Sequence, residues 1–123
     1  MLNAYPHRTT RPESQEHLIR LEGAGTSAPV KHLGAGVTLS RTGAGVYRIT
    51  WDDNPGVFLG AWAQLQAADP SDLDGYTVTF GAYDSTNQRI DMRVEDGTAA
   101  ADLGADEFAC LSIVFSTSAV GGA

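Results

Sequence analysis

The fold of this sequence is decided by residues 37–51, Val37-Thr38-Leu39-Ser40-Arg41-Thr42-Gly43-Ala44-Gly45-Val46-Tyr47-Arg48-Ile49-Thr50-Trp51. Two runs of alternating side chains, residues 37–41 and residues 46–51, flank a Gly-Ala-Gly loop. Such alternation is typical of strands, because successive side chains of a strand point to opposite faces. Glycine supplies the positive φ that a tight reversal needs, so the stretch predicts a β-hairpin.

Further short strands are predicted on both sides of this hairpin, separated by turns rich in Asp, Asn, Gly and Pro. They lie at residues 15–22, 30–33, 57–67, 76–83, 89–95 and 107–116. The run 57–67 has the composition of a helix, but Gly60 and the alternation after it favour a buried strand. About seven or eight antiparallel strands without a long helix predict an all-β fold, a jelly-roll-like β-sandwich.

Two segments near the end of the chain carry more specific expectations. The Ala-rich residues 99–103 are a candidate helical turn inside a longer connection. Residues 107–116 are nearly all apolar, so we expect a strand with both faces covered, at the centre of a sheet or at a subunit interface.

The chain has 123 residues, which fits a single domain. We expect an extended N-terminal arm over residues 1–14, the sandwich over residues 15–118 and a flexible tail over residues 119–123. The arm contains two prolines and no apolar period, and its length allows it to reach a neighbouring subunit. A frayed terminus is an equal alternative.

Charge is distributed unevenly along the chain. Residues 1–48 contain six basic and three acidic residues, whereas residues 49–123 contain two basic and twelve acidic ones. An acidic body repels a phosphate backbone, so no nucleic-acid partner is expected. No apolar run approaches the roughly 20 residues that span a bilayer, so no membrane partner is expected. The charge pattern also fits a basic arm that meets an acidic neighbour, including another copy of the chain.

Residues that usually carry chemistry are not grouped in this sequence. Its histidines lack the paired spacing of a metal site, and its one acidic loop departs from the calcium-loop pattern. Cys110 lies in the most apolar run without a basic neighbour in sequence, which favours an inert buried thiol. The residues concerned are His7, His17 and His32, and Asp69, Asp72 and Asp74. We therefore expect no enzyme activity, no metal and no cofactor.

The aromatic side chains leave two interpretations open. They fill the core of the sandwich, or some of them line a contact between identical subunits, where aromatic residues are often enriched. Trp51 and Trp62 are the first candidates for such a contact.

Three stretches resemble small bacteriophage head decoration, or cement, proteins. The hairpin of residues 37–51 resembles a "vSRTGxGxYxvtf" pattern that recurs in phage virion proteins. Residues 80–91, Phe80-Gly81-Ala82-Tyr83-Asp84-Ser85-Thr86-Asn87-Gln88-Arg89-Ile90-Asp91, and residues 99–108 look like later segments of the same proteins. The likeness spans about residues 37–116 and leaves the arm outside it. Similar hairpins also occur in phage tail-fibre and receptor-binding tips.

The resemblance implies a jelly-roll-like sandwich that forms a homotrimer on the outer surface of the phage head, after synthesis in the host cytoplasm. There it would bridge subunits of the major capsid protein and strengthen the shell. Under this hypothesis the capsid contacts are Tyr5, Arg8, Arg11 and Arg20, and the trimer contacts are Trp51, Trp62 and Phe115. A tail-fibre or receptor-binding tip that recognises host surface glycan is the alternative.

Overall fold

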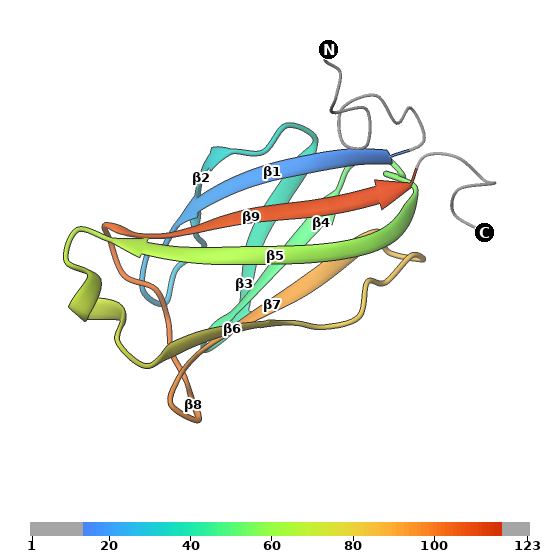
Figure 1. The fold of residues 1–123 in the computed structure, drawn as a ribbon. Coiled ribbons are helices and arrows are strands. Elements are labelled where there is room, and N and C mark those ends of the chain that lie inside the picture. The colour runs from blue at the N-terminus through green and yellow to red at the C-terminus, as the bar shows by residue number, and fades with distance from the viewer. Residues whose placement is uncertain (1–13, 117–123) are drawn as a thin grey trace, which may run out of the picture.

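The computed structural model describes residues 14–116, which form two antiparallel sheets packed against each other (Figure 1). Nine strands and one short 3-10 helix lie within these residues. They are β1 (Ser14–Glu22), β2 (Val30–Leu33), β3 (Val37–Gly43), β4 (Val46–Trp51), β5 (Val57–Ala67), η1 (Pro70–Leu73), β6 (Tyr76–Phe80), β7 (Arg89–Asp96), β8 (Ala99–Ala100) and β9 (Glu107–Ser116). The predicted all-β sandwich is confirmed. The predicted arm and tail lie outside the described residues, apart from Ser14, which begins β1.

The strand order of each sheet identifies its edge strands. The four-stranded sheet has the order β2-β1-β9-β5, and the five-stranded sheet has the order β3-β4-β7-β6, with β8 paired to β7. The short β2 lies at an edge of its sheet. The strand predicted over residues 57–67 is confirmed, but its predicted burial is wrong, because β5 is also an edge strand and none of its residues is fully buried. β5 contains a bulge between Phe58 and Gly60 where its register with β9 shifts.

The β3–β4 hairpin forms as the sequence predicts. Val37 pairs with Trp51 and Gly43 with Val46, which leaves Ala44 and Gly45 as the turn. Gly45 has a φ of +68°, and a Cβ there would lie 2.5 Å from the Val94 carbonyl oxygen. Glycine is therefore required both by the turn and by the close passage of β7.

The connection between β8 and β9 is extended rather than helical, so the expected helical turn at residues 99–103 is wrong. Four hydrogen bonds tie this segment to the hairpin. The Leu103 amide donates to the Tyr47 hydroxyl oxygen at 2.7 Å, and Asp102 accepts two bonds from Arg41, each at 2.9 Å, and one from the Gly45 amide at 2.8 Å. These tertiary bonds outweigh the helix propensity of the local alanines.

The core lies between the sheets, and β9 contributes to it from one face only. Its inward side chains from Ala109 to Phe115 are buried, while the outward ones from Phe108 to Val114 are partly exposed. The central position predicted for this strand is confirmed, because β9 lies between β1 and β5. The prediction that both of its faces are covered is wrong for the described chain. The buried apolar residues are Ile19, Leu21, Val37, Tyr47, Ile49, Trp51, Ile90, Met92, Val94, Leu103, Ala109, Leu111, Ile113 and Phe115.

Candidate interaction surface

Large hydrophobic side chains are exposed on one sheet of the sandwich. All six within residues 14–116 belong to strands of the four-stranded sheet, and all are between 46% and 62% exposed. They are Leu18, Val30, Leu33, Val57, Leu59 and Trp62. We call the side of this sheet that faces away from the core the outer face. Gathered apolar side chains on a protein surface are a common mark of a binding site.

The outer face is built from rows of residues that lie opposite one another across three strands. Ser112 in β9 lies opposite Leu18 of β1 on one side and Trp62 of β5 on the other. Trp62 is 62% exposed. A Cβ on Gly60 would meet the Trp62 ring at 2.8 Å, so glycine makes room for the indole along the strand.

A shallow hollow of about 340 Å³ opens on the same rows. Its walls come from β1, β5 and β9, so three strands far apart in sequence meet there. The residues that line it are Leu18, Trp62, Ala63, Gln64, Cys110, Leu111 and Ser112. A hollow with one large aromatic side chain on its wall is suited to an apolar side chain from a partner protein.

Arg20 is held against the outer face by three contacts. Its Nη1 donates to Gln66 Oε1 at 3.0 Å and to Cys110 Sγ at 3.1 Å. Its guanidinium carbon lies 4.2 Å from the centre of the Phe108 ring, a cation–π distance. The sheet therefore presents a positive charge in a fixed position beside the apolar side chains.

Cys110 differs from the sequence-based expectation. Its side chain points to the outer face and is partly exposed, because the apolar run in β9 has only one buried face. Arg20 becomes its basic neighbour only through the pairing of β1 with β9, which the sequence did not reveal.

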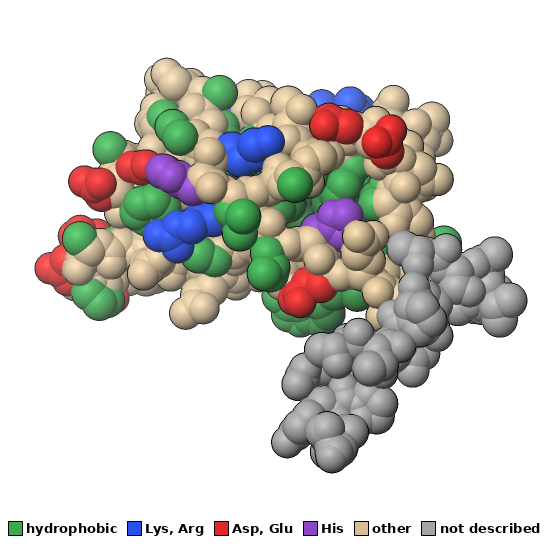
Figure 2. Space-filling view, turned by 90° about the horizontal axis from the view of Figure 1, so that it is seen from above, with side chains coloured by type: hydrophobic (Ala, Val, Ile, Leu, Met, Phe, Trp, Pro, Cys, Tyr) green, Lys and Arg blue, Asp and Glu red, His purple; other side chains and the backbone are tan. Residues whose placement is uncertain are grey.

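Positively and negatively charged side chains are mixed with hydrophobic ones on the side of the molecule that Figure 2 shows. Seen from the side on which β1 lies in Figure 1, hydrophobic side chains alternate with basic, acidic and histidine side chains (Figure 2). His32 Nε2 lies 2.8 Å from a carboxylate oxygen of Glu22, and the His32 ring contacts Phe108.

The predicted contact residues divide into three groups. Tyr5, Arg8 and Arg11 lie outside the described residues, and Arg20 lies on the outer face as above. Among the predicted trimer contacts, only Trp62 is on the surface. Trp51 is 4% exposed and Phe115 is fully buried, so the interface interpretation of these two is corrected in favour of the core interpretation.

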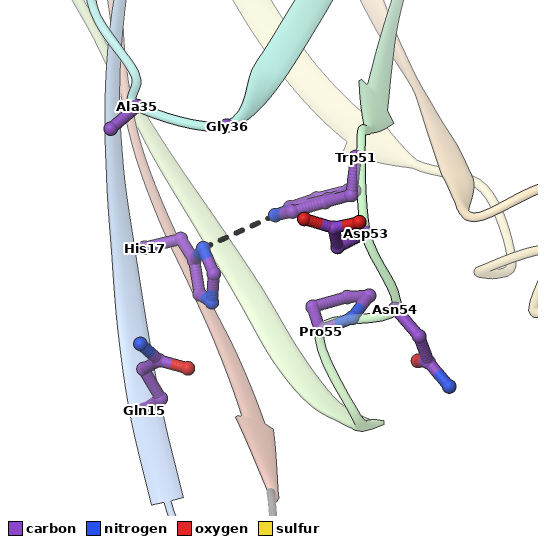
Figure 3. Close-up of a pocket in the computed structure, with 8 residues that line it drawn as sticks. All are labelled: Gln15, His17, Ala35, Gly36, Trp51, Asp53, Asn54 and Pro55. Carbon is purple, nitrogen blue, oxygen red and sulfur yellow. Dashed lines mark hydrogen bonds between the residues drawn. The ribbon is translucent and has the colours of Figure 1, made fainter.

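A second hollow, of about 200 Å³, opens at the end of the sandwich where β1 begins (Figure 3). His17 points into it from β1, opposite Trp51, whose Nε1 donates to His17 Nδ1 at 3.2 Å. His17 Nε2 is buried without a hydrogen-bond partner among the described residues. Burial lowers the pKa of His17, so the ring is neutral near neutral pH. His17 lies on the same face of β1 as the buried Ile19 and Leu21.

In the acidic loop, the Asp69 side chain caps the short helix η1. Asp69 Oδ1 accepts from the Ser71 amide at 3.0 Å and from the Ser71 hydroxyl at 2.8 Å, which caps η1 and lowers the pKa of Asp69. Within residues 14–116, no group of three or more His, Cys, Asp or Glu side chains is placed to hold a metal ion. In the same part of the chain, no helix has the length and apolar character needed to cross a membrane.

Comparison with known proteins adds no relative: no protein-family model, no curated protein and no solved structure matches this chain.

Proposed function

We propose that this chain is a structural virion protein of a bacteriophage, a decoration or cement protein that stabilises the head by bridging subunits of the major capsid protein. The outer face is the surface that we assign to the capsid. The observation that carries the proposal is that every large exposed hydrophobic side chain within residues 14–116 belongs to the sheet bearing this face. The resemblance of residues 37–116 to phage decoration proteins supplies the class of partner, the jelly-roll connectivity and the place on the head surface.

The chemistry of the outer face suits a protein partner. Leu18 and Trp62 offer apolar contact area around a hollow, and Arg20 adds a fixed positive charge nearby. Aromatic and arginine side chains carry much of the binding energy at protein interfaces. Because decoration proteins bind in many symmetric copies, each contact contributes to shell stability even when a single one is weak.

The arm supplies a second set of contacts in this proposal. Arg8 and Arg11 give the arm positive charge, so an acidic surface on a neighbouring subunit would attract the arm although it repels the acidic body. Tyr5 adds an aromatic side chain to the same segment. Removing residues 1–13 is expected to weaken capsid binding. The arm's share should also shrink as salt is raised, because ion pairs at a surface are screened.

Co-sedimentation with phage heads that lack the protein tests the proposal. Wild-type protein is expected to sediment with the heads, and the double variant Leu18→Gln/Trp62→Gln is expected to stay in the supernatant. Thr42→Gln, an exposed position on β3 in the other sheet, is the matched control and should sediment like wild type. Wild-type protein that leaves the heads unbound contradicts the proposal.

A second candidate function, a receptor-binding tip that recognises glycan, is favoured by the hollow beside His17. His17 and Asp53 both line this hollow; a neutral imidazole is able to donate a hydrogen bond and a carboxylate is able to accept one. A sugar hydroxyl both accepts and donates hydrogen bonds, so it complements this pair. Binding of wild-type protein to host surface glycans, with loss on His17→Phe, would support this candidate over the decoration role.

A further inference from the structure

One side of the sandwich leaves its core partly open to solvent. Inward-facing side chains of β5, η1 and β6 and the following Tyr83 pack against the core but remain partly exposed, whereas those of β4, β7 and β9 are buried. We call this the β5–β6 side. The partly exposed side chains on it are Phe58, Ala61, Ala63, Leu65, Leu73, Tyr76, Val78, Phe80 and Tyr83.

Both strands that border this side are sheet edges. β5 pairs only with β9, and β6 only with β7, among the described residues. Each therefore has a row of backbone amide and carbonyl groups that no strand of the described chain satisfies. β5 is eleven residues long, which is long for an edge.

The opposite side of the sandwich shows the usual protection of edges. β2 has four residues and carries Lys31, and β3 carries Arg41 and a register shift next to its turn. Lys31 Nζ also donates to the Val37 carbonyl oxygen at 2.8 Å, which joins β2 to β3 across the two sheets. Short length, charged residues and irregularities discourage the pairing of edges with other chains. β5 and β6 contain no charged residue at all.

The charge pattern indicates what covers the β5–β6 side. The chain has a net charge of -7, so two copies repel each other over most of their surface. Along β5 and β6 this repulsion is smallest, because all sixteen residues of the two strands are uncharged. The exposed acidic residues of this side, Asp69, Asp72 and Asp74, are confined to the connection that joins the end of β5 to the start of β6. An uncharged apolar strip offers nothing to a charged partner, but it is complementary to an identical strip on another copy.

We propose that the β5–β6 side packs against the same side of another copy of this chain, so that the copies complete each other's cores. This inference rests on the self-association included in the proposed function and names the surface that performs it. It leaves the outer face available to the capsid. Trp62, at the midpoint of β5, lies where the two surfaces meet.

Light scattering of purified full-length protein, with matched glutamate substitutions, tests the inference. Leu65→Glu places a negative charge on the β5–β6 side. Leu39→Glu, the control, places the same charge at a partly buried, core-facing position of β3, at the opposite edge of the sandwich. Wild type and Leu39→Glu are expected to show the mass of a multimer, and Leu65→Glu the mass of a single chain. Three copies or two copies per particle both support the inference.

A second pair of variants guards against loss of folding. Thr79→Glu on β6 and Thr42→Glu on β3 replace exposed threonines at the two opposite edges of the five-stranded sheet, so neither alters the core. A circular dichroism melt first establishes which variants are folded. If Leu65→Glu is unfolded, Thr79→Glu is expected to lower the multimer fraction at least about tenfold relative to Thr42→Glu.

Two results overturn the inference. One is a wild-type protein that stays a single chain at high concentration, and the other is a multimer that folded Leu65→Glu or Thr79→Glu leaves intact. A single chain that still sediments with phage heads overturns this inference alone and leaves the decoration role standing. A wild-type multimer that the glutamate variants dissociate, but that does not sediment with phage heads, supports this inference and contradicts the decoration role.

Discussion

Trp51 Nε1 donates a hydrogen bond of 3.2 Å to Nδ1 of His17, and this bond joins the two sheets at one end of the sandwich. The bond requires Nδ1 to carry a lone pair, so the hydrogen of the neutral ring is on Nε2. The His17 ring also contacts Phe115 edge-on at 5.4 Å between centroids. If His17 were protonated, its Nδ1 would carry a hydrogen and could no longer accept the bond from Trp51 Nε1. The two N–H groups would then face each other inside an aromatic cluster.

This arrangement predicts a loss of stability in mild acid. The pKa of His17 in the folded protein lies below its usual 6.5 because of burial. The unfolded chain therefore takes up the proton first, and the contribution of His17 is complete above about pH 6.5 and is lost as pH falls through the lower folded pKa. Thermal melts between about pH 8 and about pH 5 should show a falling melting temperature.

His17→Gln is the control for that experiment. Glutamine offers a carbonyl oxygen to the Trp51 donor but does not titrate. Its melting temperature should change less than that of wild type over the same pH range. An equal dependence of melting temperature on pH in the two proteins would contradict the role assigned to His17.

The ion pair between Arg41 and Asp102 is expected to contribute measurably to stability. Two nitrogens of Arg41 donate to the two Asp102 oxygens, each at 2.9 Å, and the Gly45 amide adds a third bond, which together lower the pKa of Asp102. Asp102→Ala should lower the free energy of unfolding by about 1–3 kcal/mol, measured by urea denaturation.

The pair between Arg48 and Asp91 is the comparison. It has similar bidentate geometry, but the Asp91 side chain is more exposed than that of Asp102. Asp91→Ala should therefore change the free energy of unfolding by only about 0–1 kcal/mol. A larger effect at Asp91 than at Asp102 would contradict the stabilising role given to the bonds of Asp102 with Arg41 and Gly45.

Gly45 and Gly97 allow backbone strain to be separated from crowding. Both have a positive φ, +68° and +67°, but only at Gly45 would a Cβ collide with backbone atoms. Gly97→Ala should cost about 1–2 kcal/mol for the left-handed conformation alone. Gly45→Ala should cost clearly more, because β7 has to move away from the turn. Denaturant unfolding of the two variants measures the difference, and equal values would contradict the close passage of Val94.

The two tryptophans should respond in opposite ways. Trp62→Gln removes an exposed side chain, so the free energy of unfolding should stay within about 0.5 kcal/mol of wild type. Trp51→Phe removes the donor to His17 and leaves space in the core, so it should cost about 1–3 kcal/mol. Chemical denaturation measures both, and a large loss at Trp62 would contradict its surface position.

Sequence patterns predicted the strands well where each face has a distinct character. In β4, Tyr47, Ile49 and Trp51 share one parity, and all three are buried. In β5, Trp62 shares its parity with Gln64, a signal that it faces solvent. These two patterns distinguish the buried Trp51 from the exposed Trp62, but the prediction that both line a subunit contact did not use them.

The remaining features depend on contacts between distant segments. Both faces of β9 are apolar, so its own sequence does not tell which face Phe115 occupies; the packing of the sheets decides that. The alanines of residues 99–103 favour a helix locally, but Leu103 is anchored by Tyr47. The outer face arises only because β1, β9 and β5 become neighbours, which places Arg20 beside Cys110.

Release of DNA from heated phage heads is the most direct test of a decoration role. Heads that lack the protein are heated with and without it, and the temperature at which DNA escapes is recorded. The decoration role predicts a higher release temperature with wild-type protein and none of this gain with Leu18→Gln/Trp62→Gln. An unchanged release temperature with saturating wild-type protein would contradict it.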